Sequence, residues 1–164
     1  MPKREHISYL PDAPFLYSWL TVRQCVELFV SRHPDFRSQV FDTFLAGSKI
    51  VSGSRVSALS KGMSERLHLA LIMARSPELY VLDEPLAGVD PVVRDHLLDL
   101  IAEFREPDVP LLLSTHLISG VGRIFDEVIL ISEGSLVAHE KAQVLREIGG
   151  GDLEVAYKRS VVNL

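Results

Sequence analysis

The sequence is poor in the features that assign a class of protein at once. Its single cysteine, Cys25, can form neither an internal disulfide nor a Cys-x-x-Cys metal site. No apolar run approaches the roughly 18 residues of a membrane-spanning helix, and residues 1–6 lack a signal-peptide apolar region. The 17 basic residues are outnumbered by 22 acidic ones, and the net charge of −5 disfavours nucleic acid and anionic membrane surfaces as partners. These absences predict a reduced, cytosolic setting.

The first part of the chain predicts two helices that follow one short strand. Pro11 and Pro14 stop the apolar stretch at 6–10. Thr21 to Gln24 has the form of a capping box, which begins a helix that ends near Pro34. The expected elements are a strand at 6–10, an aromatic connector at 15–20, helices at 21–33 and 37–45, and a Gly/Ser-rich loop at 47–57.

Beyond residue 59, helices alternate with short apolar strands. Apolar residues repeat at helical spacing from Met63 to Ala74, and Asp90-Pro91 begins another helix that runs to Phe104. The strands at 79–82 and 111–114 are short and continuously apolar, which predicts burial on both faces, as in a parallel sheet. This alternation predicts an α/β layer fold. The remaining expected elements are a helix at 118–125, a hairpin of 128–131 and 136–139, and a helix at 140–148.

Two carboxylates, Asp83 and Glu84, follow the strand at 79–82. The carboxyl ends of strands are where open α/β sheets place their ligands. Adjacent strand residues face opposite ways, so one carboxylate can support Mg²⁺ while the other addresses an attacking water. Alternatively, Asp-Glu-Pro only begins a turn. For this stretch alone the two interpretations weigh equally.

The segment Ser60-Lys61-Gly62-Met63 opens a helix, and helix N-termini attract anions. The Ser60 hydroxyl is a further donor, and Gly62 lets a phosphate approach the main chain closely. A plain Ser N-cap with a Gly in the first turn explains the same residues, and taken alone it is the favoured interpretation.

His116 follows the strand at 111–114, where an imidazole could reach a γ-phosphate or the attacking water. Lone histidines are more often structural, and His68, His96 and His139 are assigned that role. Asp90 before Pro91 is a common helix start, which alone explains it, although a ligand contact can coexist with capping.

Taken in order, these residues resemble the nucleotide-binding domain of ABC transporters, a P-loop NTPase-like fold with a helical subdomain. The resemblance covers nearly all of the chain from His6 on, and the short distance between its motifs disfavours the coiled-coil chromosome-maintenance relatives. The matching motifs are the signature loop Leu59–Met63, the Walker B strand Tyr80–Glu84, the D-loop Ala87–Asp90 and the switch histidine Ser114–His116.

The resemblance implies that two such domains, as a homo- or heterodimer, sandwich ATP and Mg²⁺ and drive a transmembrane permease subunit. It assigns Asp83 to Mg²⁺, Glu84 to the attacking water and His116 to the γ-phosphate. The ATP held by the partner domain would meet Ser60, Lys61, Gly62, Met63 and Asp90 of this chain. Asp12 stands at the Q-loop position, where the family has Gln or Glu.

The large departure from the family is the absence of a Gly-x-x-x-x-Gly-Lys-Ser/Thr phosphate loop. The resemblance places the P-loop strand between the strands at 111–114 and 128–131, so its absence leaves a slot in the sheet. We therefore expect a fragment, or a chain that rearranges to cover the gap. The expected parts are 13–75 as helical subdomain and signature helix, 76–148 as Walker B to switch-histidine core, and 149–164 as C-terminal tail.

The expected function is that of an ATP-hydrolysing transporter subunit, located at the cytoplasmic face of the membrane through its partner and inactive without a P-loop. The alternative is a non-catalytic partner that offers only its signature face, or a module that binds the membrane subunit. No nucleic acid is expected to bind.

Overall fold

The computed structural model describes residues 6–117, 121–151 and 153–162. They form two compact units, the first up to Thr115 and the second from His116 onward. This division falls within the segment 76–148, which the sequence predicts as one core.

The first unit holds a parallel sheet with the strand order β1-β2-β3. Its strands are β1 (Ile7–Leu10), β2 (Leu79–Asp83) and β3 (Leu111–Ser114). The register pairs Leu10 with Leu82, and Asp83 with Ser114. Because the strands are parallel, their carboxyl ends lie along one edge of the sheet. The predicted α/β class with a parallel sheet is confirmed.

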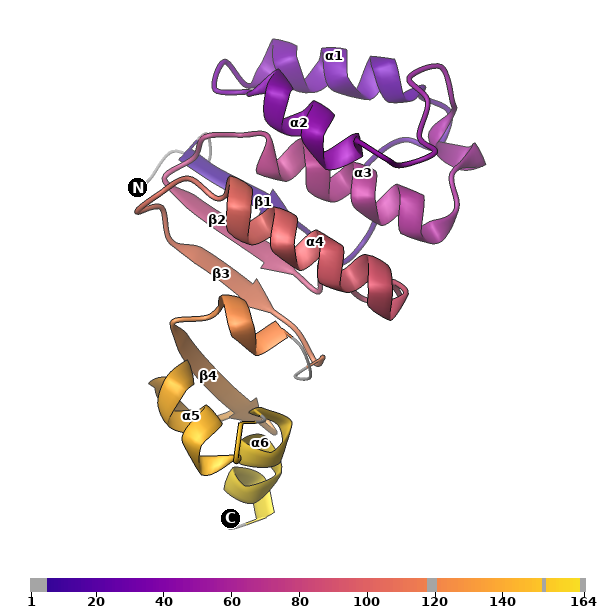
Figure 1. Cartoon of the computed structure of the whole chain (residues 1–164). Helices are drawn as coiled ribbons and strands as arrows, with labels where there is room; N and C mark the ends of the chain where they lie inside the picture. The colour runs from indigo at the N-terminus through magenta and orange to yellow at the C-terminus, as the bar shows by residue number, and fades with distance from the viewer. Residues whose placement is uncertain (1–5, 118–120, 152, 163–164) are drawn as a thin grey trace. The chain divides into compact units, whose positions relative to one another are not determined.

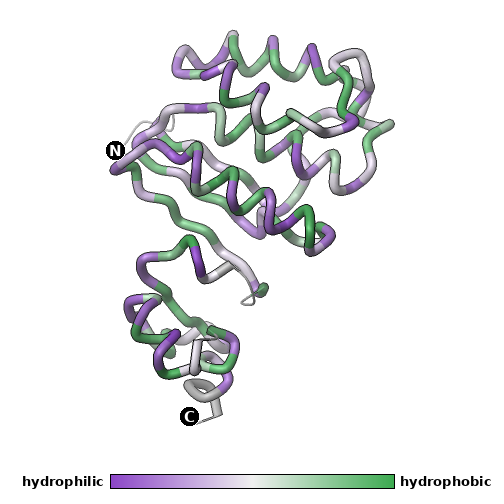
Figure 2. Tube along the Cα trace, viewed as in Figure 1, coloured by the Kyte–Doolittle hydropathy of each residue, from purple (hydrophilic) through white to green (hydrophobic). Residues whose placement is uncertain are grey.

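Burial separates the central strand from the outer one. Tyr80 and Leu82 of β2 are fully buried, and the alternate residues of β2 are half-buried. Leu112 of β3 is 56% exposed, so the prediction that the strand at 111–114 is buried on both faces is wrong. Within residues 6–117, β3 pairs with β2 alone, and Leu112 and Ser114 share an exposed face of this strand. Figure 2 shows that this edge strand is nonetheless hydrophobic along most of its length.

Four helices complete the first unit: α1 (Val22–Arg32), α2 (Ser38–Leu45), α3 (Lys61–Met73) and α4 (Pro91–Phe104). Figure 1 shows α1 and α2 stacked with α3, while α3 and α4 lie against the strands. The capping box at Thr21 is confirmed. The backbone N–H of Gln24 donates to Thr21 Oγ1 at 3.3 Å, and the backbone N–H of Thr21 donates to Gln24 Oε1 at 2.9 Å. Central in the unit is α3, whose residues from Leu67 to Met73 are all buried.

The second unit is a β-hairpin with two helices packed on it. Its elements are the 3₁₀ helix Val121–Ile124, β4 (Glu127–Ser132), β5 (Ser135–Lys141), α5 (Ala142–Ile148) and α6 (Leu153–Val162). The core of this unit contains Leu130, Leu145, Leu153 and Ala156. Glu133 and Gly134 both have positive φ, 49° and 75°, as a tight hairpin turn requires.

The predictions for this unit are partly confirmed. The hairpin is present with longer strands. The helix expected at 140–148 is present as α5, which begins after Lys141. Of the helix expected at 118–125, residues 118–120 lie outside the described residues, and the rest contains a 3₁₀ helix. The segment 149–164, expected to be a tail, contains α6. In the described parts of the chain, no helix combines the length and apolar character needed to cross a membrane.

Candidate functional site

Some of the polar residues singled out in the sequence lie at the carboxyl edge of the sheet in the first unit. Asp83 ends β2, Glu84 follows it, and Asp12 comes two residues after β1. Ser114 ends β3 opposite Asp83. The parallel register brings the ends of the three strands together, which the sequence predicts for Asp83 and Glu84.

Asp83 is half-buried, and its carboxylate accepts a hydrogen bond at Oδ1 from the hydroxyl of Ser114. This contact orients the carboxylate from the neighbouring strand. Sequence reasoning placed Ser114 in the switch motif but missed this role. The signal was in the register, since two strands that end side by side bring their last side chains within reach.

Glu84 has a backbone φ of +47°, in the left-handed region that residues with a Cβ seldom occupy. Its amide donates to Ser114 O at 3.0 Å, and its carbonyl accepts from the Ala87 amide at 3.1 Å. These bonds hold a conformation that costs about 1–3 kcal/mol, and such strain concentrates at functional positions. The strand therefore ends in a fixed turn that presents Glu84 separately from Asp83.

The signature segment opens α3 as predicted. Ser60 is the N-cap, and its Oγ accepts a hydrogen bond from the Met63 amide at 3.4 Å. The capping interpretation is thus confirmed, and the exposed Ser60 hydroxyl keeps its own proton for another acceptor. A side chain at Gly62 would meet no atom within 4 Å, so the first turn of α3 is open to an approaching anion.

Lys61 joins the start of α3 to the loop after β2. A Cβ at Gly88 would lie 2.2 Å from Lys61 Nζ, so the lysine side chain rests on this glycine. Gly88 also has a φ of +71°, which glycine tolerates best. Two residues later Asp90 caps α4, its Oδ1 accepting from the Val92 amide at 3.0 Å. The capping role expected for Asp90 is therefore present, on the same loop that Lys61 contacts.

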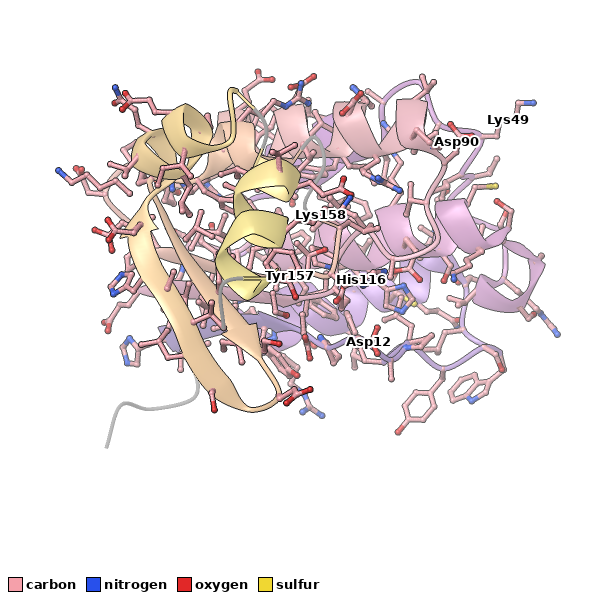
Figure 3. The ribbon with its side chains drawn as sticks, turned by 90° about the horizontal axis from the view of Figure 1, so that it is seen from below. Asp12, Lys49, Asp90, His116, Tyr157 and Lys158 are labelled. Carbon is pink, nitrogen blue, oxygen red and sulfur yellow. The ribbon has the colours of Figure 1, made fainter. Side chains whose placement is uncertain are left out.

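Asp12 and Asp90 come from different elements, the segment after β1 and the N-terminus of α4 (Figure 3). Asp12 is exposed and acts electrostatically on Glu65 of α3, a residue that the sequence analysis missed. Burial raises the pKa of Glu65, Lys61 opposes this rise, and Asp12 adds to it. The i, i+4 spacing of Lys61 and Glu65 was the available signal.

His116 belongs to the second unit, where it is the first residue and lies exposed in a bend after β3. Asp83, Glu84, Ser60, Lys61, Gly62, Met63, Asp90 and Asp12 all belong to the first unit.

The residues of the first unit fit part of a nucleotide–magnesium complex. A carboxylate already oriented by Ser114 suits Mg²⁺, which prefers oxygen ligands. The open turn at Gly62 and the Ser60 hydroxyl suit a terminal phosphate. The sequence contains no Gly-x-x-x-x-Gly-Lys-Ser/Thr loop, which is the usual cradle for the remaining phosphates.

The chain is similar to ATP-binding proteins of ABC transporters. The family model for ABC transporters matches residues 2–87. The ABC transporter ATP-binding protein YxlF of Bacillus subtilis is 27% identical over 88% of this chain and 50% of its own length. The molybdenum import ATP-binding protein ModC of Rhodospirillum rubrum is 30% identical over 84% of this chain and 38% of its own. A solved ATP-binding subunit of an ABC transporter covers 96% of this chain and 69% of its own, with a TM-score of 0.78 at 24% identity, which supports the fold.

The chain spans about half the length of the curated relatives that it matches first. The match to the family model covers just over half of the 164 residues and includes the strand with Asp83 and Glu84. This chain therefore belongs to the ATP-binding domains of ABC transporters.

Proposed function

We propose that this chain supplies the signature helix and the hydrolytic carboxylates of an ABC ATPase that couples ATP hydrolysis to transport through a membrane subunit. The observation that carries this proposal is the constrained end of β2. Asp83 is held by Ser114, and Glu84 is held at positive φ by two backbone bonds. Glu133 has a similar φ in the hairpin turn. What distinguishes Glu84 is its place at the carboxyl end of β2, beside the Asp83 carboxylate that Ser114 orients.

Asp83 would support Mg²⁺, which when bound neutralises charge on the phosphate oxygens. Glu84 would accept a hydrogen bond from the attacking water and polarise it. His116, from the second unit, would steady the γ-phosphate. Asp12, at the Q-loop position, would act on the same nucleotide, although its side chain is shorter than the Gln or Glu of the family.

Ser60, Lys61, Gly62 and Met63 would contact the ATP held by a second nucleotide-binding domain. The open turn at Gly62 admits the phosphate, and Lys61 contributes positive charge at the helix N-terminus. Since Lys61 rests on Gly88, contact with this phosphate would be sensed by the loop that carries Asp90. In the family the two domains are identical or different chains, and either arrangement would use the same residues here.

The aromatic connector before α1 supplies a surface for the membrane subunit. Tyr17 and Trp19 stack with ring centroids 5.7 Å apart, and their exposed fractions are 65% and 64%. An exposed aromatic pair is a common anchor of protein interfaces. Docking of a permease subunit here would hold the chain at the cytoplasmic face of the membrane.

Replacement of Glu84 tests the catalytic assignment. A chimera would join the part of YxlF that precedes its match to the N-terminal end of this chain, so that a complete ATP-binding domain is present. Glu84→Gln in this chimera should slow ATP hydrolysis by about a hundredfold or more, since an amide cannot act as the base. Glu78→Gln, at the exposed acid just before β2, is the matched control and should leave the rate unchanged. Unchanged turnover in the Glu84 variant would overturn the assignment.

Asp12, which stands where the family has Gln or Glu, favours a second candidate function, a non-catalytic partner that offers only the signature face. The two functions differ in what the chimera does. A chimera that binds ATP but hydrolyses it no faster than the Glu84→Gln variant supports the non-catalytic role. Hydrolysis that depends on Glu84 rejects it.

A further inference from the structure

Arginine side chains hold both ends of α2, but to different parts of the first unit. At the C-terminal end, Arg66 of α3 donates from Nε to Phe44 O at 2.5 Å and from a terminal nitrogen to Ala46 O at 2.7 Å. At the N-terminal end, Arg37 is itself the N-cap residue and reaches away from α2. The Arg66 contacts join α2 to α3, whereas the Arg37 side chain leads to the sheet.

Arg37 bonds to three elements that are distant in sequence. One terminal nitrogen donates to Met73 O at 2.9 Å and Arg75 O at 2.8 Å, where α3 ends. The same nitrogen donates to Tyr80 Oη of β2 at 3.2 Å. The other terminal nitrogen forms an ion pair with Glu106, just beyond α4. A planar guanidinium with fixed donors suits this role better than a flexible ammonium would.

A second ion pair reinforces this attachment from the turn before α2. Asp35 accepts three bonds from the side chain of Arg75: Nε donates to Oδ1 at 3.3 Å and to Oδ2 at 3.1 Å, and a terminal nitrogen donates to Oδ2 at 3.0 Å. Arg75 is 5% exposed, and it also donates to Ile7 O of β1 at 3.1 Å. Tyr80 Oη donates to Arg75 O at 2.6 Å, which links the two ion pairs. The turn between α1 and α2 is thus attached to both β1 and β2.

The strand that receives these bonds is the strand that ends in Asp83 and Glu84. Tyr80 lies near the start of β2, and the two carboxylates lie at the carboxyl end of the strand. Since β2 is short, hydrogen-bonded on both sides and buried at Tyr80 and Leu82, it transmits a displacement with little deformation.

We propose that Arg37 is a positioning residue that fixes the orientation of α1 and α2 relative to β2. A displacement of these helices is then transmitted through β2 to Asp83 and Glu84. The mechanical link is independent of the proposed ATPase function, and only its use in transport rests on that function. Arg66 joins α2 to α3 and also lies 3.5 Å from His96 Nε2 of α4, and none of these contacts involves β2, so Arg66 does not set this orientation.

Residual dipolar couplings of backbone amides in the 164-residue chain test the proposal, because they report the relative orientation of helices and strands. In the unsubstituted chain one alignment tensor should fit α1, α2, α3 and β2. In Arg37→Met, the couplings of α1 and α2 should each still fit helical geometry but require a tensor rotated from that of β2 and α3. Arg66→Met removes two arginine bonds to backbone carbonyls as a matched control and should still fit one tensor.

A single tensor for folded Arg37→Met would overturn the proposal, as would the same rotation in Arg66→Met. If Arg37→Met does not fold, Tyr80→Phe decides. It removes the hydroxyl that accepts from Arg37 and donates to Arg75 O, and it is expected to give a smaller rotation of the same sense. No rotation in Tyr80→Phe would then contradict the proposal. A merely stabilising role for Arg37 would lower stability without rotating either helix. Failure here leaves the Glu84 test of the ATPase function unaffected.

Discussion

Thr21 shows how much one polar side chain decides at the residue scale. It closes the capping box of α1, and both reciprocal bonds with Gln24 are present. Thr21→Ala should lower the free energy of unfolding by about 1 kcal/mol, because amides of the first turn lose their acceptor. Urea unfolding measures this change. Thr43→Ala, inside the exposed face of α2, is the matched control and should not destabilise the chain. Equal losses in the two variants would contradict the capping account.

His68 predicts a dependence of stability on pH. It is 3% exposed, its Nδ1 bonds to Ser64 O at 2.6 Å, and the ring of Phe15 packs edge-on against it at 4.7 Å between centroids. Burial lowers the pKa of His68 in the folded chain. The unfolded chain therefore binds the proton first, and the free energy of unfolding falls as the pH drops below about 6.5.

Replacement of His68 by Asn isolates this contribution, since the amide can still donate to Ser64 O but does not titrate. Urea unfolding at pH 5.5 and 7.5 should show a smaller loss of stability at low pH in His68→Asn than in the unsubstituted chain. His33, whose pKa burial also lowers, contributes equally to both proteins. An identical loss in both would show that His68 is not the titrating group.

The candidate site illustrates which residues a sequence can reveal. Asp83, Glu84 and Ser60 could be found because each stands at a local boundary, the end of a strand or the start of a helix. The Ser114 hydroxyl on Asp83 and the Arg37 bonds to Tyr80 could not, because they join residues 31 and 43 positions apart. Such partners become visible only when the strand register and helix packing are known.

Among the elements, β3 ends the described sheet on one side and carries Leu112, which is 56% exposed. Open strand edges of this kind invite pairing with other chains. Leu112→Lys should therefore reduce concentration-dependent light scattering while changing the free energy of unfolding by no more than about 0.5 kcal/mol. Leu113→Lys, on the less exposed face of the same strand, should destabilise the chain clearly. Unchanged scattering in Leu112→Lys would show that this edge does not mediate association.

Local pattern predicted the elements of the first unit better than those of the second. Helical spacing, Pro breaks and caps located α1, α3 and α4, since each has a start signal or a long apolar face. The short helix α2 has no side-chain cap. The helix α6 was missed because its core residues Leu153 and Ala156 make sense only against the hairpin and α5. The exposure of Leu112 was missed because an apolar run does not reveal whether a strand lies at the centre or at the edge of a sheet.

For the whole molecule, the resemblance of the ordered motifs to ABC transporter ATP-binding domains identified the family and the fold, and the family-model match agrees with it. Sequence reasoning could not divide the chain at Thr115, since this division depends on contacts between distant residues. The central claim is that Asp83 and Glu84 serve a nucleotide bound on their own side, while Ser60 and Gly62 serve one bound by a second domain.

Mixing two inactive variants of the YxlF chimera tests this claim most directly. Ser60→Arg blocks the open turn of α3, and Glu84→Gln removes the base, so each chimera alone should hydrolyse ATP poorly. In a mixed dimer, one site combines the intact Glu84 of one chain with the intact Ser60 of the other. The account predicts that ATP hydrolysis recovers on mixing. A mixture as inactive as either variant alone, with mixed dimers shown to form, would contradict it.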